Sequence, residues 1–251
     1  MNPVHYLIAA LAAFAAGAVN ALAGGGTLIT FPILTALGLP VVTANITSTV
    51  SLFLGYFGAT WAQRHDLKGQ RNRLIAFLPA AALGGLIGGL LLLYSGEKVF
   101  KQLVPFLILF ASLLLALGEP LRKRLVSQGT LQHGLTAARL GIIAIPVSLA
   151  AVYGGYFGAG LSVIILAILA LLLDDTLTRL NALKQFIAFA ANTAAAVLFL
   201  FSGGVNWSVA AVMAVSALLG GIAGGRLAGR VNPVALRWIV VTIGLMVAVI
   251  F

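Results

Sequence analysis

The sequence predicts an all-α polytopic membrane protein, and three observations lead to this fold class. Hydrophobic residues make up 61% of the 251 residues, charged residues only 8%, and the mean hydropathy is +1.12. A typical soluble domain carries about 25% charged residues. The apolar runs are continuous, whereas a transmembrane β-barrel would alternate apolar and polar residues along each strand. A soluble globular domain and a disordered chain are therefore excluded.

Apolar runs of about 20 residues are long enough to cross the hydrocarbon core of a membrane as helices. In the first half such runs cover residues 4–22, 42–62, 73–94 and 99–118, with a shorter apolar piece at 27–38. In the second half they cover 135–153, 178–202, 206–229 and 232–251, with a shorter piece at 161–173. The first run lacks the basic start of a signal peptide, so we expect it to remain as a membrane segment.

The two halves repeat one architecture, so we expect a single transmembrane domain with repeats at about 1–120 and 134–251. Asn45 and Asn181 lie 136 residues apart. The same spacing relates two sets of glycines inside uninterrupted runs, where close helix packing is the better interpretation: Gly84, Gly85, Gly88 and Gly89, and Gly220, Gly221, Gly224 and Gly225. A glycine-rich break also recurs, at 24–26 and at 154–160.

The distribution of charge predicts that the repeats are inverted. If the chain turns back at each break, each half crosses the membrane an odd number of times. Twelve lysines and arginines then lie on one side, including a basic loop that begins at Arg122, and only Lys98 and Lys101 lie on the other. A single crossing at each break would divide the cations almost evenly. The positive-inside rule favours the first arrangement. Each repeat is then a glycine-broken helical hairpin followed by three transmembrane helices, and both termini are periplasmic.

The paired breaks predict a binding site. Backbone groups at membrane depth must be satisfied within the protein or line a watery cavity. Matching breaks in two repeats indicate the substrate site of a transporter, and the amides at the start of a helix attract anions. The alternative is that the glycines only permit tight turns. The candidate residues at the breaks are Gly24, Gly25, Gly26, Thr27, Gly158, Gly160 and Ser162.

Polar residues beside the breaks complete this hypothesis. Lys184 is the cation that lies well inside an apolar run, and intramembrane ionisable residues are functional candidates. The alternative is a lysine that snorkels to the interface. Further amides and hydroxyls follow in the runs nearest the breaks, where hydrogen bonding between helices is the other interpretation: Asn20, Asn45, Thr47, Ser48 and Asn181. Together these groups predict a donor-rich, net-positive pocket suited to a small oxyanion.

Other functions lack support in the sequence. The chain has no cysteine, no cluster of metal-binding residues, no nucleotide-binding loop and no nucleophile motif, so we expect no metal, no cofactor and no enzymatic activity. The net charge of +10 is best interpreted as loop charge that orients helices, not as a nucleic-acid surface. The expected partners are a small anion and the lipid bilayer, and the oligomeric state, a homo-oligomer included, stays open.

Two stretches resemble a known family. Gly17-Ala-Val-Asn-Ala-Leu-Ala-Gly-Gly-Gly-Thr-Leu-Ile-Thr-Phe-Pro, followed by Ala44-Asn-Ile-Thr-Ser, resembles the opening of the TauE/SafE sulfite exporter family. Tyr153-Gly-Gly-Tyr-Phe-Gly-Ala-Gly and Asn181-Ala-Leu-Lys resemble its second signature. The resemblance implies a secondary carrier of the bacterial inner membrane for sulfur-containing anions such as sulfite, thiosulfate or organosulfonates.

The expected mechanism is alternating access, with the anion between the two breaks. Proton coupling would have to use Lys184, a histidine or the protonation of the substrate itself. The alternatives are an anion channel, a carrier for a carboxylate without sulfur, and a membrane-embedded interaction subunit that transports nothing.

Overall fold

The computed structural model describes residues 2–127, 136–228, 230 and 233–250. All regular elements in this described part are helices, and six of them are long and apolar enough to cross a membrane. This confirms the all-α membrane fold class. Part of the predicted basic loop, His133 included, lies outside the described residues.

The first half contains α1 (Pro3–Leu22), α2 (Thr27–Ala36), α3 (Val41–Ala62), the 3-10 helix η1 (Arg64–Leu67) and α4 (Arg71–Ser127). Its first helix begins where the Asn2 side chain accepts a hydrogen bond from the amide of His5. Such a cap satisfies one of the amides that have no partner within the helix. α4 is a pair of helices joined at Gly96, whose φ of 68° turns the chain sharply.

The second half contains α5 (Ala137–Tyr156), α6 (Leu161–Leu172), α7 (Leu177–Leu200), α8 (Trp207–Leu227) and α9 (Pro233–Ile250). Three of these helices begin at a side chain that accepts a hydrogen bond from the amide three residues further on. These caps are Thr136, Thr176 and Asn206.

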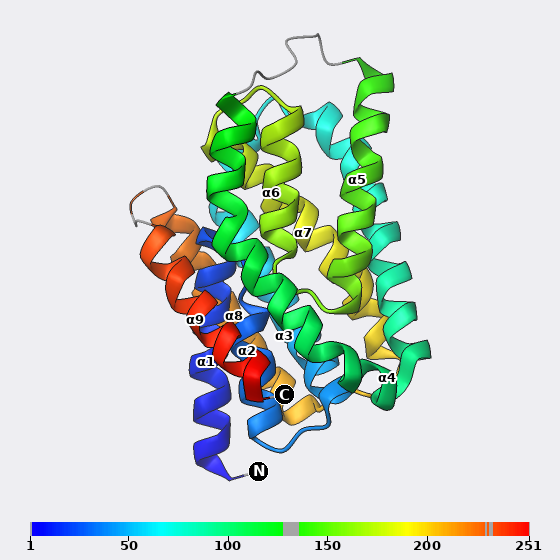
Figure 1. Ribbon diagram of the computed structural model, residues 1–251, viewed down its shortest axis with the longest axis vertical. Helices are drawn as coiled ribbons and strands as arrows, with labels where there is room; N and C mark the ends of the chain where they lie inside the picture. The colour runs from blue at the N-terminus through cyan, green and yellow to red at the C-terminus, as the bar shows by residue number, and fades with distance from the viewer. Residues whose placement is uncertain (1, 128–135, 229, 231–232, 251) are drawn as a thin grey trace.

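The path of the chain reverses at both glycine breaks (Figure 1). α1 runs away from the end where the N-terminus lies, α2 runs back toward that end, and α3 starts from it. α5 and α6 form a similar hairpin that enters from the opposite end. Both chain termini lie at one end of the molecule (Figure 1). This path agrees with an odd number of crossings in each half, while the symmetry that relates the halves stays a prediction.

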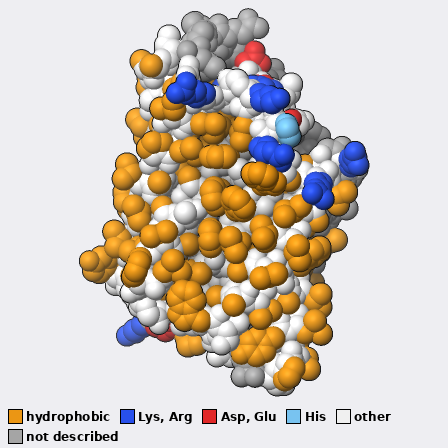
Figure 2. Space-filling model, turned by 180° about the vertical axis from the view of Figure 1, so that it is seen from behind, with side chains coloured by type: hydrophobic (Ala, Val, Ile, Leu, Met, Phe, Trp, Pro, Cys, Tyr) orange, Lys and Arg blue, Asp and Glu red, His pale blue; other side chains and the backbone are white. Residues whose placement is uncertain are grey.

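The charged side chains gather at the ends of the molecule and leave an apolar belt between them (Figure 2). Most of the lysines and arginines visible on this face lie at the end opposite the termini. Many of the large side chains on the belt are apolar and solvent-exposed, such as Leu11, Phe106 and Ile142. A surface of this kind is stable only against lipid, as the membrane fold requires.

The glycines with the 136-residue spacing pack helices together, as the sequence predicts. On α4, a side chain added at Gly88 would strike the backbone of α5, and one at Gly85 would strike the backbone of α7. On α8, a side chain at Gly224 would strike α1, and one at Gly221 would strike α3. Since Gly88 matches Gly224 and Gly85 matches Gly221, equivalent glycines bring together helices from opposite halves.

Two predicted boundaries are wrong. α5 continues through Tyr156, so Gly154 and Gly155 are helical and the break is confined to 157–160. The reason is packing, because Gly155 lies against the backbone of Gly85 on α4. The second arm of α4 also extends to Ser127, past the apolar run that ends at 118. Helical hydrogen bonding continues there beyond the hydrophobic segment.

Carboxylates fix two of the connections. Glu97, next to the bend of α4, accepts hydrogen bonds from the amides of Val41 (2.7 Å) and Val42 (3.1 Å) at the start of α3. A carboxylate is favourable at this end of a helix. In the connection between α6 and α7, Asp175 pairs with Arg73 (2.5 Å) and Arg179 (2.9 Å). Burial alone would raise the pKa of Asp175, but the hydrogen bonds from the two arginines outweigh it and hold the pKa below its usual value.

We expect Gly88→Ala to lower the thermal unfolding midpoint of the detergent-purified protein. The added methyl group would press against the carbonyl of Val152 and force α4 and α5 apart, at a cost of about 1–3 kcal/mol. Gly141→Ala is a matched control, since nothing lies within 4 Å of a carbon added at this helical glycine. Alanine favours a helix over glycine by about 1 kcal/mol, so the control should be neutral or stabilising. Equal midpoints for both variants would contradict the packing role.

Candidate functional site

The first break (residues 23–26) and the second break (residues 157–160) are built on left-handed glycines. The φ angles are 84° at Gly24, 89° at Gly25, 82° at Gly158 and 80° at Gly160. Residues with a Cβ atom rarely adopt this conformation. Glycine is therefore required for the chain to leave one half-helix and enter the next within four residues.

The two breaks touch each other inside the protein. A carbon added at Gly24 would lie 2.8 Å from Cβ of Ser162, and one added at Gly158 would lie 3.4 Å from Oγ1 of Thr27. Each break therefore contacts the start of the half-helix that follows the other break. In this conformation an anion directly between Gly24 and Ser162 would require the two breaks to separate.

The other predicted glycines face different neighbours. A carbon added at Gly25 would meet Leu115 on α4, and one added at Gly160 would meet Ala111 on the same helix. Gly26 lies against Asn20, whose Oδ1 accepts a hydrogen bond of 2.7 Å from its amide. These three glycines therefore fit the breaks against α1 and α4 and do not face the opposite break.

Backbone amides at the second break are available to a ligand. Within the described residues, the amides of Gly158, Ala159 and Gly160 donate no hydrogen bond. They precede the start of α6, where the helix dipole favours negative charge. Three adjacent free donors at a helix start are a suitable arrangement for an oxyanion.

Two asparagines satisfy the carbonyls left open where the first half-helices end. Asn45 on α3 donates a hydrogen bond of 2.9 Å to the carbonyl of Tyr156, at the end of α5. Asn181 on α7 donates one of 3.4 Å to the carbonyl of Ala21, near the end of α1. Each asparagine therefore donates a hydrogen bond to a carbonyl just before the break of the other half. The sequence predicts these residues beside the breaks, and the structure gives their amide groups a supporting task.

The hydroxyls predicted on α3 are buried and already bonded. Ser48 shares a hydrogen bond of 2.6 Å with Thr30 on α2. Oγ1 of Thr47 accepts one of 3.0 Å from the amide of Asn206, at the start of α8. Ser48 therefore holds the α2 half-helix of the first hairpin, while Thr47 points toward a different connection.

Lys184 is enclosed by protein. Its relative exposure is 1%, and it makes no hydrogen bond or ion pair within the described part of the chain. Such burial does not fit a lysine that snorkels to the membrane interface. A buried cation without a partner is costly unless a ligand or water compensates its charge.

Three polar residues near the breaks are missed by the sequence analysis. Gln185 donates a hydrogen bond of 3.0 Å to the carbonyl of Asn20, and Gln63 accepts one of 2.7 Å from Asn181. The hydroxyl of Tyr56 faces Ser162 and Asn192. The position of Gln185 beside Lys184 is a signal that could have found it. Gln63 follows an apolar run and precedes Arg64, so the sequence alone predicts an ordinary loop residue there.

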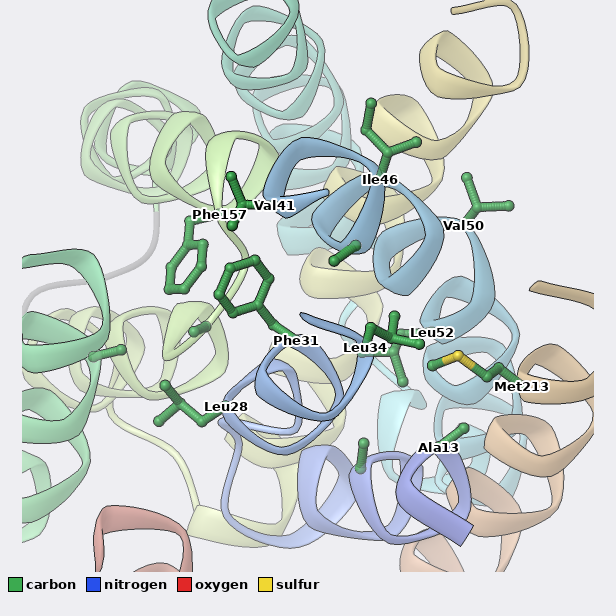
Figure 3. Close-up of a cluster of buried hydrophobic side chains, with 14 of the residues drawn as sticks. Ala13, Leu28, Phe31, Leu34, Val41, Ile46, Val50, Leu52, Phe157 and Met213 are labelled. Atoms are coloured by element: carbon green, nitrogen blue, oxygen red, sulfur yellow. The ribbon is translucent and has the colours of Figure 1, made fainter. Parts of the chain in front are cut away.

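Aromatic rings from α2, α4 and α5 pack around Phe157 of the second break. The ring of Phe31 on α2 meets that of Phe157 in the second break at a centroid distance of 5.4 Å (Figure 3). Phe100 packs against Phe31 at 6.2 Å and against Tyr156 at 5.6 Å. Pro32, the residue after Phe31, lines a hollow of about 820 Å³ between α2, α4 and α9. Phe31 and the lining of this hollow are thus neighbours along α2.

No cluster of three or more metal-binding side chains occurs among the described residues. Hairpins broken by glycine, apolar spanning helices and buried donors together define a class of protein: a polytopic membrane transporter. The chain belongs to the sulfite exporter TauE/SafE family, whose model matches residues 9–251.

Curated relatives carry names that agree with this class. A probable membrane transporter protein of Haemophilus influenzae is 29% identical over 93% of this chain and 89% of its own length. Probable membrane transporter protein ORF9 of a Sinorhizobium species is 28% identical over 95% of this chain and 89% of its own length. Probable membrane transporter protein YfcA of Escherichia coli K12 is 26% identical over 90% and 82%. A transporter family does not imply enzymatic activity.

We expect Asn45→Leu to destabilise the protein, because the partly buried carbonyl of Tyr156 would lose its donor at a cost of about 1–3 kcal/mol. Thr242→Val is the control, since its hydroxyl bonds within its own helix and is exposed. Thermal unfolding in detergent, with limited proteolysis at the second break, measures both variants. If Asn45→Leu unfolds at the same temperature as the parent, the asparagine does not support the break.

Proposed function

We propose that the protein is a secondary transporter that moves small sulfur-containing anions by alternating access. Sulfite, thiosulfate and organosulfonates are the candidate substrates. The family description names sulfite export, which supports this substrate class. The observation that carries the proposal is the contact between two glycine breaks whose surroundings offer hydrogen-bond donors and one buried lysine.

The chemistry of the breaks supports an anionic substrate. The free amides of the second break and the side chain of Lys184 would bind negatively charged oxygens. Asn45 and Asn181 would hold the half-helices in position, and Asn20 would hold the first break through the amide of Gly26. Any proton coupling would use Lys184, a histidine or the protonation of the anion.

The orientation in the membrane is part of the same proposal. The two repeats would be inverted, with both termini in the periplasm of a bacterial inner membrane. Most of the visible cations lie at the end opposite the termini (Figure 2), and under the positive-inside rule this supports a cytoplasmic position for that end. Hairpins entering from opposite ends (Figure 1) suit two halves that move against each other.

Single-cysteine labelling tests the orientation, because the chain has no cysteine of its own. In intact spheroplasts we expect a membrane-impermeant maleimide to label Lys98→Cys, at the periplasmic bend of α4. Lys68→Cys, at the opposite end, should react only after the membrane is permeabilised. Both positions are exposed. The reverse labelling pattern would contradict periplasmic termini.

Binding and transport test the function. We expect the purified protein to bind sulfite or thiosulfate saturably in calorimetry, and to exchange it by counterflow in proteoliposomes. Lys184→Ala should weaken binding at least tenfold, because the buried positive charge is lost. Lys98→Ala removes an exposed lysine and should bind normally.

The other outcomes identify the alternatives. Flux without counterflow would show a channel, and a preference for acetate over sulfur anions would show a carboxylate carrier. A well-folded protein that binds none of sulfite, thiosulfate, sulfate, sulfoacetate, taurine, phosphate and acetate would contradict the proposed substrate class. Co-purification of such a protein with a partner would favour an interaction subunit.

A further inference from the structure

Two buried amide groups beside the first break have NH₂ groups without a partner. Asn20 is 2% exposed and Gln63 is 4% exposed. Nδ2 of Asn20 and Nε2 of Gln63 are buried and make no hydrogen bond within the described part of the chain. A buried donor without an acceptor costs free energy, so these two groups require an explanation.

The oxygen of each amide is already engaged, which fixes the direction of its NH₂ group. Oδ1 of Asn20 accepts from the amide of Gly26, which can only donate. Oε1 of Gln63 accepts from Nδ2 of Asn181, and Nδ2 also donates to the carbonyl of Ala21. Since both partners are donors, neither amide can be rotated without losing a hydrogen bond. The free atoms are therefore the nitrogens.

The hydrogen bonds bring these donors to the same place in the fold. Asn181 links Gln63 to the carbonyl of Ala21, the residue after Asn20. Gln185, four residues further along α7, donates to the carbonyl of Asn20 itself. Lys184 lies between these two contacts on α7 and is three residues from Asn181, so it shares a helix face with Asn181. The end of α1 is thus surrounded by side chains of α3 and α7.

The balance of donors and acceptors indicates the charge of a ligand. Three groups have unused donors here: Asn20, Gln63 and Lys184. Two groups with unused acceptors lie near them: Oε1 of Gln185, and the hydroxyl of Thr60, one turn before Gln63 on α3, which can donate or accept. None of the described residues forms an ion pair with Lys184. Three donor groups, one of them a lysine amine, against one carbonyl acceptor and one hydroxyl favour a ligand with several negatively charged oxygens.

We propose that Gln63 and Asn20 bind the oxygens of a small oxyanion together with Lys184. The transport role of this binding site rests on the proposed function. The donors lie at the end of α1, beside the first break. Movement of the first hairpin would therefore change their spacing and couple anion binding to the contact between the two breaks.

Two isosteric substitutions test the donors without removing the observed hydrogen bonds. Gln63→Glu keeps an oxygen for Asn181, and Asn20→Asp keeps an oxygen for the amide of Gly26. Each replaces only the free NH₂ group by an anionic oxygen. We expect each variant to bind sulfite and thiosulfate at least tenfold more weakly in calorimetry. The unfolding midpoint without anion should be equal or higher, because the new carboxylate pairs with Lys184.

Gln102→Glu is the control. It also adds one carboxylate, but at an exposed position of α4 where no hydrogen bond of the described residues is lost. Its anion affinity should equal that of the parent. Unchanged affinity in Gln63→Glu and Asn20→Asp would overturn the proposal.

A double-mutant cycle in the absence of any anion separates this inference from the proposed function. Gln63→Glu should be neutral or stabilising when Lys184 is present, and clearly destabilising in the Lys184→Met background. Such coupling without binding of sulfur anions would support the donor cluster and contradict the proposed substrate. Absence of coupling would overturn the cluster, even if the parent protein transports sulfite.

Discussion

The structure depends on one constraint: backbone groups inside a membrane must find their hydrogen-bond partners within the protein. A continuous helix meets this constraint without outside help, but a broken helix does not. Here α1 and α5 end at glycine breaks inside the protein, and side chains from the opposite half donate to carbonyls that the break leaves without a helical partner. Asn45 on α3 and Asn181 on α7 thus support the breaks together with the contacts within each hairpin.

The same dependence between halves governs the packing of the uninterrupted helices. Glycines on α4 allow the backbones of α5 and α7 to pack closely against it, and the equivalent glycines on α8 do the same for α1 and α3. Hydrophobic burial gives little preference between helix partners in lipid, so close van der Waals contact between backbones has to provide specificity. The halves are held together by contacts that run from one to the other at equivalent positions.

The fold was largely predictable because its signals are strong and local. Twenty-residue apolar runs, repeated glycines and paired breaks are visible without knowledge of tertiary contacts. The second break was predicted three residues too long, since nothing local shows that Gly154 and Gly155 are helical glycines that pack against neighbours. The length of α4 was missed for a related reason, because helix formation outside the membrane does not require an apolar sequence.

The candidate site was predictable in its location and less so in its roles. Lys184 could be recognised because a lysine in an apolar run is unusual. The roles of Asn45 and Asn181 could not be predicted, since they depend on which carbonyls of the other half lack a hydrogen-bond donor. Gln63 gave no signal at all, because its importance arises only when α7 brings Asn181 to its oxygen.

The amide contacts between halves also have a consequence for biogenesis. When the ribosome has completed the first hairpin, the carbonyl of Ala21 has no partner, because Asn181 is made 160 residues later. Until then, the carbonyl of Ala21 must be hydrogen-bonded by another group, such as water, a lipid headgroup or an insertion factor. Completion of the first break is thus a late event in assembly, although it lies near the start of the chain.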